Sequence, residues 1–154
     1  RNGVGANVTW VQLGTTNVND FEPMELAAAI KARRVIVSRG PYIDASVDGD
    51  WASGQTFTGA TTLRIEILAP TWMQVDFVDL YKDGELYETQ ELEGVIEFEL
   101  APEADAVYVV MARGDTDMAP VYPGISPWAM TAAIRVDVDG DGWTAPKPGL
   151  TYAR

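Results

Sequence analysis

Hydrophobic and polar residues alternate over short stretches along most of this chain. The stretch TLRIEIL, residues 62–68, places Leu63, Ile65 and Ile67 on one face and polar side chains on the other. This period of two is typical of a β-strand with one buried face. The same alternation predicts strands at residues 7–13 and 95–100. Residues 106–113, AVYVVMAR, are apolar nearly throughout, as expected of a central strand, and residues 130–138 are predicted to form the last strand.

A hairpin is predicted over residues 75–88, VDFVDLYKDGELYE. Asp83-Gly84 supplies the two residues with positive φ that a type I′ turn requires. The alternation slips at Phe77-Val78, which predicts a β-bulge there.

One helix is predicted near the N-terminus. Asp20 is expected to cap it, and Pro23 fits its first turn, where a missing amide costs nothing. The stretch MELAAAIKARR, residues 24–34, is rich in helix formers and ends on Arg33 and Arg34, which suit the negative end of the helix dipole. Residues 35–49 then read as two strands separated by Gly40-Pro41.

Roughly eight strands and a single helix predict a mainly β protein, an immunoglobulin-like antiparallel β-sandwich with one N-terminal α-helix. Three parts are expected. Residues 1–40 form a strand-helix-strand segment, residues 41–142 form the sandwich, and residues 143–154, rich in Pro and Gly, form a tail or exit linker.

Composition narrows the possible functions. The 154 residues carry a formal charge of −12, which disfavours nucleic acid and anionic membranes as partners and favours cations. No apolar run is long enough to insert across a bilayer. The chain contains no His and no Cys, so it cannot build a Ser-His-Asp triad, a Cys-His nucleophile, a Cys/His zinc site or a disulfide. No two of its 23 acidic residues stand out as an acid–base pair, so no catalytic residue is predicted.

The stretch DVDGDGW, residues 137–143, matches the first half of a calcium-binding loop. Its predicted Ca²⁺ ligands are the carboxylates of Asp137, Asp139 and Asp141 and the carbonyl of Trp143. The twelfth position is Pro148 rather than Glu, so the loop is not an EF-hand. The alternative interpretation is a solvated acidic turn without a metal.

A further ligand would have to come from elsewhere in the chain. Asp115 and Asp117, in the acidic stretch GDTD, are the candidates.

Five Trp residues raise the possibility of carbohydrate binding, since flat aromatic faces can stack on sugar rings. Trp10 lies within a predicted strand and is expected in the core. Trp51, Trp72 and Trp128 stand beside Asp50, Pro70 and Pro127 in turn-like contexts and are the candidate ligand-binding residues. Burial in the core is the competing interpretation for all of them.

Four segments in order resemble the region after the catalytic barrel in bacterial PHP-type metallohydrolases related to carbaryl hydrolase, the CehA/McbA group. They are GANVTWVQLG, ARRVIVSRGPYIDASVDG, LAPTWMQVDFVDLYKDGE and SPWAMTAAIRVDVDGDGW. The family's His-rich metal cluster is absent from this chain, so the resemblance carries over no catalytic residue. An Asn-Pro pair of the family's terminal segment is replaced by Ala132-Ala133, and an Arg before Thr9 is missing.

The resemblance implies a piece of a larger bacterial protein, secreted, periplasmic or displayed at the cell surface. Its expected role is that of a non-catalytic accessory domain that packs on an upstream catalytic barrel, with Ca²⁺ rigidifying the loop at residues 137–141. The alternative is a free-standing cell-surface or carbohydrate-binding module. An enzyme in its own right is the third hypothesis.

Overall fold

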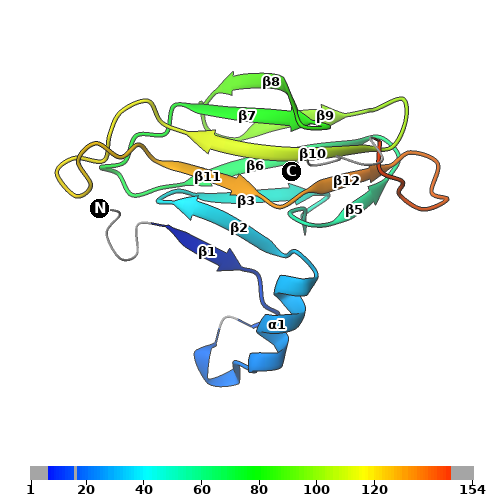
Figure 1. Ribbon diagram of the computed structural model, residues 1–154, viewed down its shortest axis with the longest axis horizontal. Helices are drawn as coiled ribbons and strands as arrows, with labels where there is room; N and C mark the ends of the chain where they lie inside the picture. The colour runs from blue at the N-terminus through cyan, green and yellow to red at the C-terminus, as the bar shows by residue number, and fades with distance from the viewer. Residues whose placement is uncertain (1–6, 16, 147–154) are drawn as a thin grey trace, which may run out of the picture.

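The computed structural model describes residues 7–15 and 17–146 and confirms a mainly β fold built from two packed sheets (Figure 1). The larger sheet has eight strands within the described residues: β1 (Val8–Val11), β2 (Val35–Arg39), β5 (Thr56–Thr58), β7 (Phe77–Lys82), β8 (Glu85–Glu91), β10 (Ala106–Arg113), β11 (Trp128–Thr131) and β12 (Ile134–Asp137). The smaller sheet has four: β3 (Tyr42–Val47), β4 (Asp50–Trp51), β6 (Thr61–Leu68) and β9 (Ile96–Leu100).

Strand β10 is the centre of the larger sheet. It pairs with β7 along one edge, and with β12 and then β11 along the other. In the smaller sheet the strands lie side by side in the order β4-β3-β6-β9. All pairings between these strands are antiparallel except that of β12 with β5, which is parallel. The predicted antiparallel sandwich is therefore confirmed, with one parallel edge beside the C-terminal end of β12.

The core lies between the sheets, where alternate side chains of each strand meet. The smaller sheet contributes Leu63 and Phe98, and the larger sheet contributes Leu80 and Val110, all essentially inaccessible to solvent. Burial of each such side chain stabilises the fold by about 1.5–3 kcal/mol relative to leaving it exposed. The predicted inward face of residues 62–68 is correct at Leu63, which is fully buried.

Helix α1 (Pro23–Lys31) begins where Pro23 predicts, but its cap differs from the prediction. Glu22 is the N-cap and makes no side-chain capping bond. Asp20 instead ends a short 3-10 helix, η1 (Val18–Asp20), where its carboxylate accepts a hydrogen bond from the side-chain amide of Asn17. The helix ends before the predicted arginines, because Arg33 adopts a left-handed conformation (φ 62°) that turns the chain into β2.

The strand predicted over residues 130–138 is broken into β11 and β12 at Ala132 and Ala133. The strand partners change at this point: β11 pairs with β2 and β10, whereas β12 pairs with β10 and β5. At the break, the Ala132 amide donates to the Ser53 hydroxyl at 2.9 Å and to the Val35 carbonyl at 3.3 Å.

The β7–β8 hairpin is confirmed, with Asp83 and Gly84 both at positive φ. Its bulge is not at Phe77-Val78 as predicted. The register shifts between Leu80 and Tyr81, which pair with Glu88 and Leu86, so the extra residue is Tyr87 of β8.

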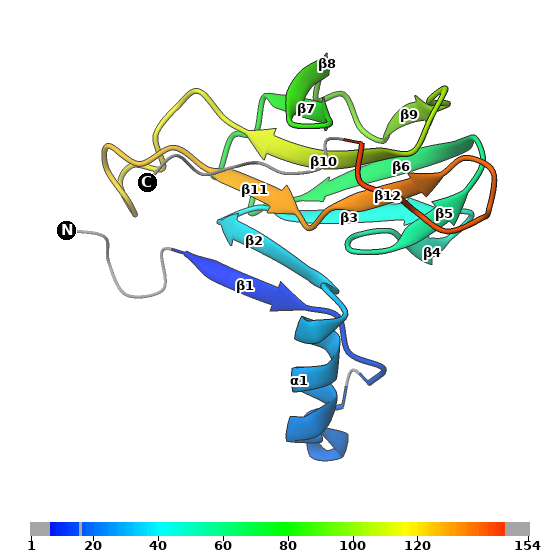
Figure 2. The ribbon, with the colours of Figure 1, turned by 45° about the vertical axis from the view of Figure 1, so that its right-hand side comes forward.

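The N-terminal segment forms an arm that projects from the sandwich. Strand β1 pairs with β2 at the edge of the larger sheet, and α1 extends beyond that edge (Figures 1 and 2). We refer to β1 and α1 together as the N-terminal arm. Strand β2, also within the first 40 residues, pairs with β11 and is thus continuous with the sandwich. Among the described residues, α1 is too short and too polar to cross a membrane, and no other helix qualifies.

Candidate functional site

The carboxylates of the predicted calcium loop lie at one end of the sandwich, where β12 finishes. Asp137 is the last residue of β12, and Asp139 and Asp141 follow in the loop. The neighbouring strand β10 runs antiparallel, with Ala106 opposite Val136, so Asp105 just before β10 arrives at the same end. The ends of two adjacent strands thereby bring together acidic residues that are 32 positions or more apart in sequence.

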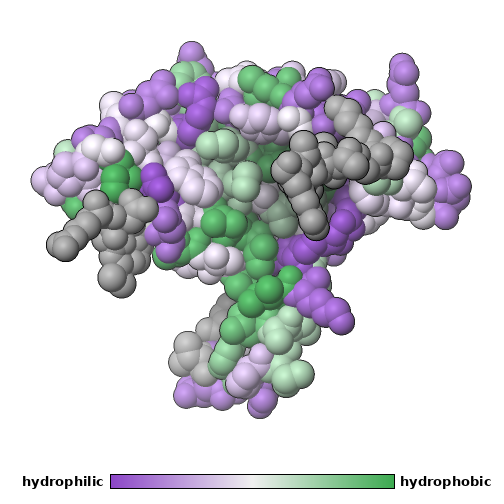
Figure 3. Space-filling model, viewed as in Figure 1, coloured by the Kyte–Doolittle hydropathy of each residue, from purple (hydrophilic) through white to green (hydrophobic). Residues whose placement is uncertain are grey.

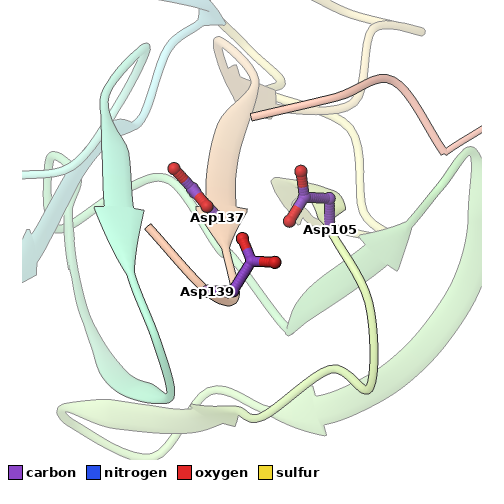
Figure 4. A group of neighbouring side chains, drawn as sticks. All are labelled: Asp105, Asp137 and Asp139. Atoms are coloured by element: carbon purple, nitrogen blue, oxygen red, sulfur yellow. The ribbon is translucent and has the colours of Figure 1, made fainter. Parts of the chain in front are cut away.

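Asp105, Asp137 and Asp139 each offer a carboxylate oxygen, and these oxygens lie within 4.8 Å of one another (Figure 4). We call these three residues the acidic cluster. Asp137 is 6% exposed, while Asp139 reaches solvent. Three converging carboxylates of this kind can hold a metal ion, since hard cations are bound by oxygen ligands.

Backbone amides fix the two inner carboxylates. The oxygens of Asp137 accept hydrogen bonds from the Gly140 and Gly142 amides at 2.9 and 3.1 Å. Asp105 accepts from the Val138 amide at 3.0 Å and from the Thr144 amide at 2.6 Å. A carboxylate has about four acceptor positions, so each retains capacity for a cation.

Electrostatics differ across the cluster. The amide of Thr144, and after it that of Val138, lowers the pKa of Asp105 below its ordinary value, which keeps this side chain ionised. The pKa of Asp141 is raised, chiefly by the negative charge of Asp139 and a hydrogen bond to it. The negative charges of Asp139 and Asp141 therefore repel each other in the protein alone, and a bound cation would relieve this repulsion.

The predicted ligands are placed as follows. Asp137 and Asp139 belong to the acidic cluster, and Asp141 stands beside Asp139, with its amide 3.3 Å from an Asp139 oxygen. Trp143 is anchored by its side chain. Its indole N–H donates to the Ala106 carbonyl at 3.2 Å, and the guanidinium of Arg135 lies over its ring at 4.6 Å.

The prediction that Asp115 or Asp117 completes this site is wrong. Both follow the opposite end of β10, about 26 Å away along an eight-residue strand. Asp115 pairs with Arg113, and Asp117 accepts from the Gly124 amide. The residue that joins the cluster is Asp105, which sequence reasoning missed. An antiparallel pairing of the strands predicted at 106–113 and 130–138 would have indicated Asp105, because the start of the first strand then lies beside the end of the second.

The Trp residues separate into different environments. Trp10 was expected in the core but is 46% exposed, because β1 is an edge strand whose face the smaller sheet covers only partly. Its ring makes an edge contact with Tyr42 at 5.5 Å between centroids, and Tyr42 lies 6.4 Å from Trp51. Trp128 lies under the Arg39 guanidinium, and Trp72 is exposed on the segment between β6 and β7. The structure thus groups Trp51 with Trp10 and Tyr42.

Comparisons with known proteins add little. No family model matches the chain, and no curated protein matches it. One similar solved structure is the neutron crystallographic structure of a Jonesia denitrificans lytic polysaccharide monooxygenase, at 16% identity and a TM-score of 0.33. The match covers 58% of this chain and 59% of that one. A likeness this slight carries no argument about fold or function.

Proposed function

We propose that this chain is a non-catalytic accessory β-sandwich of a secreted bacterial protein, packed through its N-terminal arm on a metallohydrolase-like catalytic barrel. A calcium ion at the acidic cluster holds its C-terminal loop. The complete lack of His and Cys supports the non-catalytic role, since it removes the usual nucleophile–base pairs. The resemblance to the CehA/McbA group supports the identity of the barrel.

The observation that carries the packing role is the exposed surface of α1. At 100° per residue, Met24, Ala27, Ala28 and Ile30 fall within an arc of about 160°, together with Lys31, and all five are exposed. Met24 is 80% exposed. Hydrophobic residues also gather over the arm in the surface view (Figure 3). A helix normally buries such an apolar arc, so this one favours a partner surface.

The metal is assigned to calcium because all the donors are oxygens. The acidic cluster, with Asp141 beside it, contains no nitrogen or sulfur ligand of the kind that transition metals prefer. Calcium accepts irregular geometry and six to eight oxygens, which carboxylates, loop carbonyls and water together can supply.

The packing role is tested by titrating the chain into a purified barrel of a CehA/McbA-type metallohydrolase and following binding by calorimetry. The double variant Met24→Glu/Ile30→Glu is expected to bind at least about tenfold more weakly, because it places charge in the apolar arc. The matched control is Leu86→Glu/Val121→Glu, which changes two exposed apolar residues that lie outside the arm.

Failure of the unmodified chain to bind the barrel, or equal binding by both double variants, would contradict the packing role. Turnover of ester or phosphoester substrates by the chain alone, above that of buffer containing the same divalent metals, would contradict the non-catalytic role.

A further inference from the structure

Two hollows adjoin on the outer face of the smaller sheet, the second of them bordered also by β1 of the larger sheet, and both are separate from the acidic cluster. One, of about 520 Å³, is lined by Asp44, Ser46, Asp48, Gly49, Thr62, Arg64 and Glu97. The other, of about 400 Å³, is lined by Trp10, Val11, Gln12, Tyr42, Trp51 and Leu68. Strand β3 joins them, because its alternate residues Tyr42, Asp44 and Ser46 face outward while the intervening residues are buried.

The second hollow is an aromatic platform with fixed rings. Tyr42 contacts Trp10 edge-on, with an interplanar angle of 78°, and lies at 36° to Trp51. The Trp51 indole N–H donates to the Ser53 carbonyl at 2.8 Å, which holds the ring in place. All six lining residues are uncharged, although the chain as a whole carries −12. The platform therefore suits a neutral ligand with an apolar face.

The first hollow supplies hydrogen-bond acceptors. Asp44 of β3 stands directly opposite Glu66 of β6, a like-charge cross-strand pair that is normally unfavourable. Arg64 pairs with Glu66 at 3.0 Å, and both side chains remain about two-fifths exposed. Arg64 therefore serves Glu66, and within the described residues the Asp44 carboxylate makes no hydrogen bond or salt bridge. That carboxylate can accept from ligand hydroxyl groups, which form strong bonds to ionised oxygen.

We propose that this outer face binds a neutral oligosaccharide, with sugar rings stacked on Trp10 and Trp51 and hydroxyl groups donating to the carboxylate of Asp44. Tyr42 to Ser46 spans about 13 Å of strand, which favours an extended ligand over a single ring. The acidic surroundings disfavour sulfated or uronic sugars. This inference goes beyond the accessory role and does not depend on it.

A basic peptide is the other ligand that an acidic, aromatic surface could attract. The uncharged platform and the central Arg64 make it the weaker fit, because a cationic chain would meet a positive charge between the carboxylates. The two ligand classes differ in their response to salt, since ion pairing is screened and stacking is not.

The test is calorimetric titration with cellohexaose, xylohexaose, mannohexaose and laminarihexaose, and with an octalysine peptide, each at 0.05 and 0.5 M NaCl. We expect one of the neutral hexasaccharides to bind with little salt dependence. Trp51→Ala and Asp44→Asn should each weaken that binding at least about tenfold. Trp72→Ala, an exposed Trp on another segment, is the matched control and should bind as the unmodified chain does.

Asp44→Asn keeps the size of an exposed-face side chain, so it separates loss of ligand contact from loss of fold, which circular dichroism checks. Absence of binding to all four hexasaccharides would overturn the proposal, as would salt-sensitive binding of octalysine alone. Binding by Asp44→Asn and by Trp51→Ala that is as tight as that of the unmodified chain would also overturn it. Repeating the titration in chelator and with Met24→Glu/Ile30→Glu separates this face from the proposed calcium site and from the exposed surface of α1.

Discussion

The two ends of β10 carry two acidic turns that look alike in sequence and differ in structure. At the C-terminal end, Arg113 pairs with Asp79 at 2.7 Å and with Asp115 at 3.0 Å. At the N-terminal end, the acidic cluster has no salt bridge to Lys or Arg within the described residues. The nearby Arg135 stacks on Trp143 instead. Arg113 neutralises part of the charge of one turn internally, and the other turn leaves its charge for an external cation.

The difference lies in where the carboxylates point. Asp79 and Asp115 both point at the guanidinium of Arg113, and Asp79 also accepts a hydrogen bond from the Thr89 hydroxyl. In the acidic cluster, the oxygens of Asp137 and Asp139 approach one another. Density of acidic residues is thus a weaker guide to a cation site than convergence of their oxygens.

The largest expected effect is at the neutralised end. Asp79→Ala removes a nearly buried carboxylate that holds Arg113, whose pKa is raised chiefly by its hydrogen bond to Asp79. We expect a loss of about 3 kcal/mol in the free energy of unfolding, measured by urea denaturation. The loss should be the same in calcium and in chelator. An unchanged free energy of unfolding in Asp79→Ala, or a loss that differs between calcium and chelator, would contradict the distinction between the two turns.

The second effect is confined to the other end. At a calcium concentration 100 times Kd, binding to the folded state alone stabilises the protein by about 2.7 kcal/mol. Asp139→Asn should lose most of this gain while unfolding normally in chelator, because Asp139 is exposed and its removal relieves Asp141. Asp115→Asn, the matched variant in the neutralised turn, should retain the whole gain. Equal calcium responses in the two variants would contradict this assignment.

The smallest effect is a pH dependence in chelator. The raised pKa of Asp141 means that the folded chain binds this proton more tightly than the unfolded chain. Its contribution is therefore lost as pH rises from about 3.9 through the folded pKa. Asp105 acts in the opposite direction, because its pKa is lowered in the folded chain. Its contribution to stability is present above its ordinary pKa and is lost as pH falls through the folded pKa.

Thermal melts of the unmodified chain and Asp141→Asn check this pH dependence. The variant should lack the decline above pH 4, and the calcium-dependent rise in Tm of the unmodified chain should grow between pH 4 and 7. A calcium response that is constant over this range would exclude Asp141 from the coupling.

The fold class was predictable because residues 62–68 alternate cleanly and residues 106–113 form a short, almost wholly apolar run of the kind found in central strands. Residues 106–113 coincide with β10, and the type I′ turn at Asp83-Gly84 needs only local chemistry. The failures are tertiary in origin. Nothing local reveals that the last predicted strand would pair with β2 over its first residues and with β5 over its last, and so divide between them.

The candidate site was half predictable for the same reason. Asp137 and Asp139 lie two apart in one loop, so their spacing alone suggests shared ligation. The pairing of β10 with β12 brings Asp105 to the acidic cluster. Asp115 lies beyond the opposite end of β10, where it pairs with Arg113. Trp10 was misplaced because strand periodicity does not reveal which strands lie at an edge.

Calorimetric titration of calcium into the metal-stripped chain measures directly whether the acidic cluster binds the ion. We expect one ion bound per chain, with Kd at or below about 1 mM, and loss of that binding in Asp139→Asn but not in Asp115→Asn. No binding heat, together with the same Tm in calcium and in chelator, would contradict it.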